Sequence, residues 1–153
     1  MKFKLKELVI SIAIPLAVGL IFSIFSRSNM VYKEILKPFL SPPGFVFPIV
    51  WTILYVLMGI SSLIIYNSSS YKREDALKLY IVQLFVNGFW TVIFFNLRFY
   101  FLAFLWIILL IVLVVIMFLR FYNIDKKAAY LQIPYLIWLT FALYLSFGVF
   151  VLN

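Results

Sequence analysis

The chain has 153 residues, of which 67% are apolar, 21% are aromatic and 12% are charged. A water-soluble domain is about 45–50% apolar and about 25% charged, so this composition leaves too few polar side chains to cover a soluble core. It excludes a soluble enzyme, a disordered chain and a nucleic-acid-binding domain, and it predicts a protein whose solvent is the lipid bilayer. The net charge of +8 is then explained by basic residues that flank membrane spans and contact lipid headgroups.

Five runs of the chain are long and apolar enough to cross a bilayer, which takes about 20 residues. They cover residues 5–25, 45–66, 76–95, 100–121 and 128–152. Only helices and closed barrels satisfy their backbones in lipid, and these runs are too long and continuous for barrel strands. The sequence predicts an all-α integral membrane protein, a single five-transmembrane-helix bundle over residues 1–153. The N-terminus also has features of a signal peptide, but its long apolar run and unclear cleavage site favour an uncleaved first helix.

Lysine and arginine are unequally distributed between the two ends of the predicted helices. Nine of the 13, Lys2 among them, fall in or next to the N-terminus and the second and fourth loops; the others are Arg27, Lys33, Lys37 and Arg98. The positive-inside rule therefore places the N-terminus in the cytoplasm, with the first loop and the C-terminus outside. The bacterial plasma membrane is the expected location, since no organelle-targeting extension is recognised.

The residue types that are missing restrict the chemistry. The chain has no cysteine and no histidine, which excludes cysteine nucleophiles, histidine-based triads, disulfides, and zinc or haem held by these residues. We therefore expect no cofactor and no metal. All five acidic residues fall at span ends or in loops, so neither a buried proton relay nor a general acid or base is predicted inside the bundle.

The third span carries two amides on one helical face. Gln83 and Asn87 are four residues apart, and Trp90 and Phe94 continue the same face. An amide without a partner in hydrocarbon costs several kcal/mol, so these side chains should point into the bundle. Hydrogen bonding between helices is the favoured interpretation, and a polar contact in a ligand cavity is the alternative.

Two other spans carry aromatic stripes at helical spacing. Phe47 and Trp51 belong to the second span, and Tyr135, Trp138 and Ala142 to the fifth. Such stripes are more often packing surfaces than binding sites. Pro134, in the same span, is expected to kink its helix.

The first loop, residues 26–44, is rich in proline. Pro38, Pro42 and Pro43, followed by Pro48, fix the backbone and remove donors, so the segment cannot be one continuous helix. It is nevertheless apolar enough to pack. We expect a stiff cap over one end of the bundle.

These features together resemble the translocator protein family, also called tryptophan-rich sensory proteins (TspO/MBR), over almost the whole chain. Any one motif is modest, but their order and spacing over five spans are specific. The motifs are Lys37-Pro38, Pro42-Pro43, Phe47, Trp51, Tyr55, Gln83, Asn87, Trp90, Ile133-Pro134-Tyr135, Trp138, Phe141-Ala142 and Leu152-Asn153.

The resemblance implies a five-helix bundle with a pocket under the first loop. Members bind tetrapyrroles such as protoporphyrin, and synthetic isoquinoline carboxamides; some bacterial members promote light-dependent oxidative breakdown of protoporphyrin, and eukaryotic members also bind cholesterol. Matching pocket positions here, with their neighbours on the same helical faces, give the candidate ligand site: Tyr32, Pro42, Trp51, Gln83, Asn87, Trp90, Phe94, Tyr135, Trp138 and Ala142. By the same resemblance, Trp51 and Trp138 are the candidate catalytic residues for photochemistry.

A flat macrocycle with two carboxylates fits these residue types. Indole faces of the kind that Trp51, Trp90 and Trp138 supply stack on such a ring, and Arg27, Lys33 or Lys37 would supply charge at the mouth. The chain departs from the family at Val31 and Leu40, where many members have Trp, and at Ser146, where many have Asn. No basic residue follows Lys127, so the family's weak sterol motif is absent from the fifth span.

Several functions stay open at this point. The first is a receptor or sensor for tetrapyrroles, and the second is a photo-oxidative enzyme acting on the bound ring. A transporter of porphyrins or other small apolar ligands is a third, against which stand the odd number of spans and the lack of inverted repeats or buried charge. A non-catalytic membrane adaptor is the fourth. The lipid bilayer is the expected partner, nucleic acid is not, and small residues such as Gly88 would allow a homodimer.

Overall fold

The computed structural model describes residues 3–26 and 28–153. Lys2 and Arg27, counted above among the basic residues, lie outside these ranges. The described residues form helices and connecting turns. The elements are α1 (Leu5–Phe25), α2 (Ser28–Glu34), α3 (Val46–Tyr66), α4 (Arg73–Thr91), the π-helical turn η1 (Val92–Asn96), α5 (Tyr100–Ile124), α6 (Lys126–Tyr130) and α7 (Ile133–Leu152).

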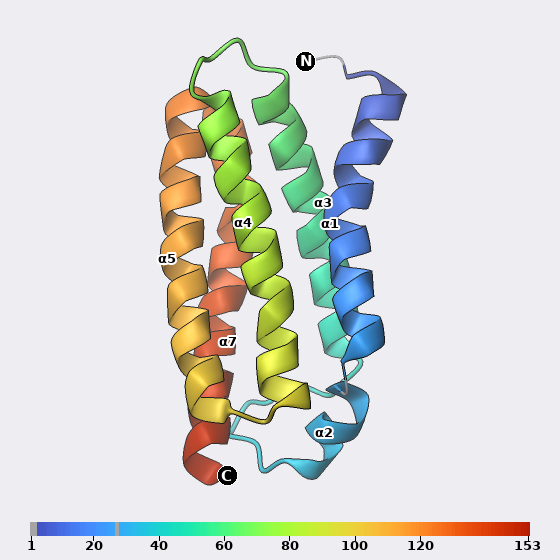
Figure 1. Cartoon of the computed structure of the whole chain (residues 1–153), viewed down its shortest axis with the longest axis vertical. Coiled ribbons are helices and arrows are strands. Elements are labelled where there is room, and N and C mark those ends of the chain that lie inside the picture. The colour runs from blue at the N-terminus through green and yellow to red at the C-terminus, as the bar shows by residue number, and fades with distance from the viewer. Residues whose placement is uncertain (1–2, 27) are drawn as a thin grey trace.

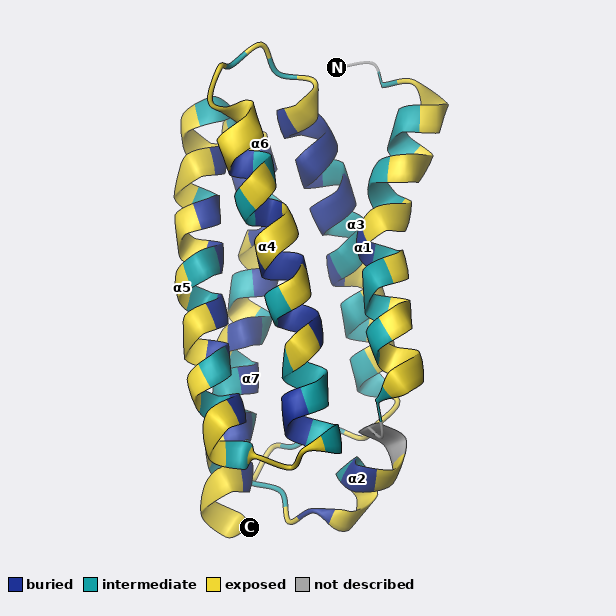
Figure 2. Cartoon of the chain, viewed as in Figure 1, coloured by how far each residue is buried: buried dark blue, intermediate teal, exposed yellow. Residues whose placement is uncertain are grey.

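Five helical segments are long and apolar enough to cross a membrane: α1, α3, α4 with η1, α5, and α6 with α7. They run up and down in one elongated bundle, with the N-terminus and the C-terminus at opposite ends (Figure 1). The all-helical fold confirms the predicted fold class. Figure 2 shows buried residues on the inward faces and exposed ones on the outward faces. Since the exposed residues include many large apolar side chains, the outward surface suits lipid rather than water.

The helices are arranged around two packed pairs. α1 lies against α3 and α4, while α5 lies between α4 and α7. α1 and α3 come close together at Gly59, where an added Cβ would stand 2.6 Å from the Cα of Ile12 and from the carbonyl oxygen of Ser11. Only a glycine permits this contact, which fixes the angle between the two helices.

Two spans differ in detail from the sequence prediction. Pro134 does not kink a continuous helix: α6 ends at Tyr130, and Pro134 lies in the first turn of α7, where its missing N–H costs no hydrogen bond. The third span ends in a π-helical turn, marked by the bond from Leu97 N to Val92 O at 2.9 Å. The bonded residues of a π turn are five positions apart instead of four, so the side chains beyond it point in a different direction than they would in an α-helix.

The first loop forms a short helix and then an extended segment. α2 covers Ser28–Glu34, and the chain then crosses the C-terminal end of α7 and returns to α3 (Figure 1). We call residues 28–45 the lid.

Gly88 does not offer a free surface for a second copy of the chain. A Cβ added there would stand 2.2 Å from the ring of Phe22 on α1 of the same chain. The close approach predicted at Gly88 is therefore a contact within the bundle.

Candidate functional site

Aromatic rings from the lid, α3 and α7 form a continuous chain of contacts. Tyr32 meets Phe47 with ring centroids 5.1 Å apart, and Phe47 meets Trp138 at 5.8 Å. Trp138 in turn meets Trp51 edge to face, with centroids 6.4 Å apart and planes at 89°. Trp51 then contacts Tyr135 at 6.2 Å. Side chains far apart in the sequence thus converge under the lid, between α3 and α7.

The two indoles touch each other and leave no gap for a third ring between them. Stacking of a planar ligand needs an open face, whereas Trp51 and Trp138 present an edge to a face. Both indoles are half-buried. A flat ligand that contacted both indoles would have to separate them or lie across their outer faces.

Beneath the indoles, three polar side chains form a hydrogen-bonded triad. The Asn87 amide donates to the Tyr135 hydroxyl at 2.9 Å, and that hydroxyl donates to Gln83 Oε1 at 2.8 Å. All three side chains are buried. The triad joins α4 to α7. The two amides therefore form hydrogen bonds between helices, which was the favoured interpretation of their spacing. The Nε2 of Gln83 has no hydrogen-bond partner among the described residues.

Trp90 and Phe94 belong to a second aromatic cluster at the end of α4. Their rings stack with centroids 4.9 Å apart, and Trp90 also meets Phe95 edge to face at 5.9 Å. The contact with Phe94, four residues on, has ordinary helical spacing, whereas the contact with Phe95, five residues on, fits the π turn of η1. The indole nitrogen of Trp90 is buried and has no partner in the described chain.

The lid fills the space above this second cluster. Val31 is 1% exposed and Ile35 is 7% exposed, and both pack with Ile93 and Phe94. On α7, Ala142 and Ser146 are buried on the face that carries Tyr135 and Trp138, and the Ser146 hydroxyl has no partner among the described residues. The predicted residues Trp90 and Phe94 therefore lie under the lid, in a cluster of their own, whereas Ala142 is buried in the main core with Tyr135 and Leu139.

Hydrogen bonds inside the lid give it a fixed shape. The Tyr32 hydroxyl donates to the carbonyl of Pro42, and burial raises the pKa of that hydroxyl, so it keeps the proton that it donates. The Lys37 ammonium donates to the Tyr32 carbonyl at 2.7 Å and lies 4.7 Å from the centre of the Tyr32 ring. Of the three basic residues expected at the mouth, Lys37 therefore already has partners within the lid, and Lys33 is exposed. Arg27 lies outside the described residues.

Three contacts fasten the lid to α7, and together we call them the clasp. The Tyr144 hydroxyl donates to the carbonyl of Phe39. A Cβ added at Gly148 would stand 2.5 Å from the ring of Pro38, so the glycine makes room for the proline. The Asn153 side chain hydrogen-bonds the backbone of Leu36.

The roles of Tyr144 and Gly148 in the clasp do not follow from the sequence. The sequence shows a glycine in a helix of otherwise bulky residues and a loop rich in proline. Neither feature indicates that the two lie in contact. Asn153 belongs to the family motif Leu152-Asn153, but the motif does not indicate which residue its side chain contacts.

Chemically, the site offers aromatic faces, buried hydrogen-bond donors and a stiff cover. The lid carries one acidic side chain, Glu34, which is exposed and paired with Arg98 at 2.8 Å; the rings and amides described under the lid include no carboxylate for acid–base chemistry. It suits the binding of a flat, apolar molecule with a few polar atoms.

Comparison with known proteins gives consistent matches along the chain. The model of the TspO/MBR family matches residues 11–152. A tryptophan-rich protein TspO from Chlorobaculum tepidum is 33% identical over 157 residues, which cover 100% of this chain and 99% of that protein. A protein of the same name from Archaeoglobus fulgidus is 33% identical over 149 residues, 96% of this chain and 97% of the relative. A translocator protein from Sus scrofa is 32% identical over 121 residues, 77% of this chain and 72% of the relative. Since the family match includes α3, the lid and α7, where the aromatic chain lies, this chain belongs to the TspO/MBR family of multi-pass membrane proteins.

Proposed function

We propose that this protein is a membrane receptor or sensor that binds a flat tetrapyrrole, such as protoporphyrin, under the lid. The observation that carries the proposal is the chain of ring contacts from Tyr32 through Phe47 and Trp138 to Trp51. Each good stacking pair contributes about 0.5–1.5 kcal/mol beyond burial, and the site offers several. Membership of the family supports the same choice of ligand.

Binding requires the lid or the indoles to move. Because Trp51 and Trp138 meet edge to face, the macrocycle stacks on one of them only after they separate or after the lid lifts. Three buried donors without partners in the described chain, Gln83 Nε2, Trp90 Nε1 and Ser146 Oγ, would pair with polar atoms of the ligand. A synthetic isoquinoline carboxamide is aromatic and carries one carbonyl, so it should compete for the same site.

The test is a titration of the purified protein in lipid nanodiscs with protoporphyrin. We expect saturable quenching of tryptophan fluorescence and reversal by an isoquinoline carboxamide. A linear, non-saturating response equal to that of empty nanodiscs would refute the proposal.

We propose further that the bound ring is broken down oxidatively in light, with dioxygen as the oxidant. An indole can exchange an electron with an excited macrocycle, and Trp51 and Trp138 are the tryptophans of the aromatic chain. Illumination of the complex should bleach the porphyrin absorbance in the presence of dioxygen. The double variant Trp51→Phe/Trp138→Phe, compared at equal bound porphyrin, should lose this bleaching; retention of the wild-type rate would contradict the role of the indoles.

We also propose that the lid faces the outside of a bacterial plasma membrane. Most basic residues lie at the opposite end of the bundle, with the N-terminus and the loop between α3 and α4, which favours a cytoplasmic position for that end. The chain has no native cysteine, so a cysteine introduced by substitution is the one thiol that can be labelled. In intact cells, Lys33→Cys should react with a membrane-impermeant maleimide and Ser69→Cys should react only after lysis; the reverse pattern would overturn the orientation.

A further inference from the structure

The five long helices form a ring in which one neighbouring pair is not packed. α1 packs against α3 and α4, α4 packs against α5, and α5 packs against α7. α3 and α7, which complete the ring, do not form a packed pair of backbones within the described residues. The seam between these two helices is therefore closed by side chains rather than by close packing of the helices themselves.

The other seams are held by contacts that leave no passage for a ligand. At Gly59 the backbone of α3 lies against the backbone of α1, and at Gly88 α4 lies against the Phe22 ring of α1. The Trp106 indole on α5 donates to the Val86 carbonyl on α4 at 2.7 Å. Opening these seams would separate closely packed helices or break a hydrogen bond within hydrocarbon, where no water replaces it.

The seam between α3 and α7 is tied at the end away from the lid. The Ser61 hydroxyl on α3 donates to the Ala128 carbonyl on α6 at 2.7 Å, and Gln132 Nε2, just before α7, donates to the Ser61 hydroxyl at 3.0 Å. All three residues are buried. Any opening of this seam is therefore confined to the half near the lid.

In the lid half, aromatic rings close the seam. Phe47 and Trp51 of α3 both contact Trp138 of α7, with ring centroids 5.8 and 6.4 Å apart. The side-chain hydrogen bonds of the described α3 and α7 residues include none between these two helices. Both indoles are half-buried, and Ile137, next to Trp138, is 66% exposed. The rings thus lie at the edge of the lipid-facing surface.

Lifting the lid would cost more than parting these rings. Val31 and Ile35 are buried against Phe94 in one cluster, and the clasp and the ion pair between Glu34 and Arg98 at 2.8 Å hold the lid in place. A lifted lid would expose the apolar cluster to water at the membrane surface. Parted indoles would instead meet lipid tails, which are as apolar as a protein core, so their separation carries no comparable penalty.

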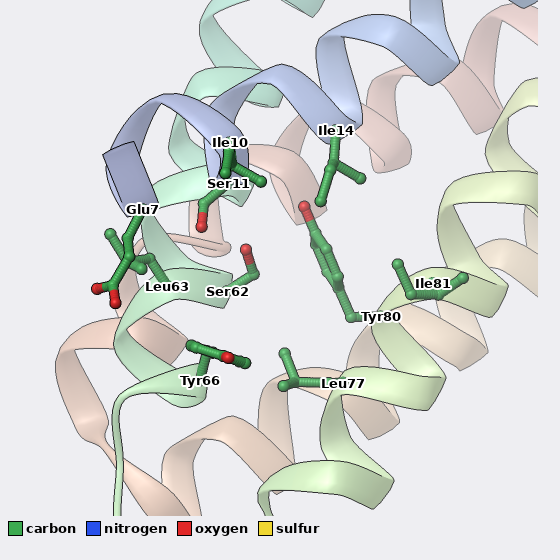
Figure 3. Close-up of a pocket in the computed structure, with 10 residues that line it drawn as sticks. All are labelled: Glu7, Ile10, Ser11, Ile14, Ser62, Leu63, Tyr66, Leu77, Tyr80 and Ile81. Carbon is green, nitrogen blue, oxygen red and sulfur yellow. The ribbon is translucent and has the colours of Figure 1, made fainter. Parts of the chain in front are cut away.

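A hollow between α1, α3 and α4 offers no alternative entry. It lies at the end of the bundle away from the lid, between the start of α1, the end of α3 and the start of α4 (Figure 3). Its lining includes Ile14, Leu63 and Ile81 but no residue of the candidate site. The hollow therefore does not open onto the chain of aromatic contacts, whereas the seam between α3 and α7 is bordered by that chain.

We infer that the tetrapyrrole enters its site laterally from the bilayer, between the lid halves of α3 and α7, while the lid stays fastened. Phe47, Trp51 and Trp138 form the gate. This inference rests on the proposed function, because it names the route to that same site. An apolar macrocycle dissolves in lipid tails while its two carboxylates keep it near the headgroups, at the depth of the lid half. Each ring contact that it breaks in the gate is replaced by a contact with its own flat face.

A reversible cross-link between the lid and α7 tests the route. Leu36→Cys/Asn153→Cys, placed at one contact of the clasp, is joined by a short bis-methanethiosulfonate reagent in proteoliposomes of phosphatidylcholine. Mass spectrometry measures the cross-linked fraction, and a reductant releases the link. Protoporphyrin is added by stopped flow, and the rate of tryptophan quenching is compared before and after release in the same preparation.

The rates before and after release distinguish the two routes. We expect them to agree within twofold, because the lid does not move for entry. A rate more than twofold lower in the cross-linked form, restored by the reductant, would show entry under the lid; it would overturn the inference and leave the proposed function standing. If neither these forms nor the wild type show saturable quenching, the proposed function fails, and this inference fails with it.

Variants then locate the gate. Phe47→Leu removes one ring from the seam between α3 and α7 and should raise the association rate of protoporphyrin several-fold. Phe104→Leu is the matched control, because it removes a ring that contacts Phe147 between α5 and α7 at 5.3 Å, and it should leave the rate unchanged. Equal association rates in the two variants would contradict a gate between α3 and α7.

Discussion

The side chain of Asn153 pairs with both backbone polar groups of Leu36. Its Oδ1 accepts from the Leu36 N–H at 3.2 Å, and its Nδ2 donates to the Leu36 carbonyl at 2.8 Å. The pairing copies the two-point hydrogen bonding between neighbouring strands, with one side chain in place of a strand. It ties the middle of the lid to the end of α7 and so couples the cover of the site to a helix that supplies Trp138.

Asn153→Ala should loosen the lid and leave the bundle intact. The substitution removes both bonds to Leu36, each worth about 0.5–1.5 kcal/mol, and the bond from Asn153 Nδ2 to the Val149 carbonyl in the last turn of α7, at 2.8 Å. Hydrogen exchange followed by mass spectrometry should show faster exchange in the lid and unchanged exchange in α3 and α5. Asn123→Ala, an exposed asparagine at the end of α5, is the control; equal lid exchange in the two variants would contradict the role of Asn153.

Gly148→Ala should push the lid away from α7. An added Cβ would stand 2.5 Å from Pro38 Cβ and Cγ, and a proline ring cannot rotate aside. We expect faster exchange across residues 35–41 and a raised rate of proteolysis in the lid. Gly44→Ala is the matched control, because a Cβ there would meet Tyr32 at 3.7 Å, an ordinary contact. Equal lid exchange in Gly148→Ala and Gly44→Ala would contradict the role of the contact between Gly148 and Pro38.

Tyr135→Phe should destabilise the bundle. It removes the hydroxyl that accepts from Asn87 and donates to Gln83, and leaves both amides without that partner in the core. Interhelical hydrogen bonds in membranes average roughly 0.6–2 kcal/mol, so we expect a loss of about 1–2 kcal/mol in the free energy of unfolding.

Reversible unfolding in mixed detergent micelles would measure this loss. Tyr130→Phe serves as the control, because Tyr130 is exposed at the end of α6. An unchanged stability in Tyr135→Phe would mean that the triad contributes nothing measurable.

The helices could be predicted because hydropathy and length are local properties of the sequence. α1 occupies Leu5–Phe25, the range expected from the apolar run alone, and α3 begins one residue later than expected. The sequence could not show whether Pro134 kinks one continuous helix or begins a new one, because proline is compatible with both. The π turn after Thr91 leaves no recognised pattern in the sequence.

The sequence predicts which residues form the site better than it predicts how they are arranged. Trp51, Trp138 and Tyr135 lie on helical stripes, and helix packing brings such stripes together. Whether two indoles leave a slot or touch depends on the relative rotation of α3 and α7, which no residue spacing encodes. The clasp joins residues more than 100 positions apart, as in Tyr144 to Phe39, and a single hydrogen bond of this kind has no periodicity to reveal it.

Protoporphyrin affinity in ring-removal variants tests the central claim most directly. Trp51→Leu and Trp138→Leu each remove one aromatic face from the chain of contacts under the lid, and each should weaken binding about tenfold, a change of roughly 1.4 kcal/mol. Phe118→Leu, which removes a ring on α5 that pairs with Tyr122, should bind as the wild type does. If both tryptophan variants keep wild-type affinity while folded, the ligand does not bind against these indoles.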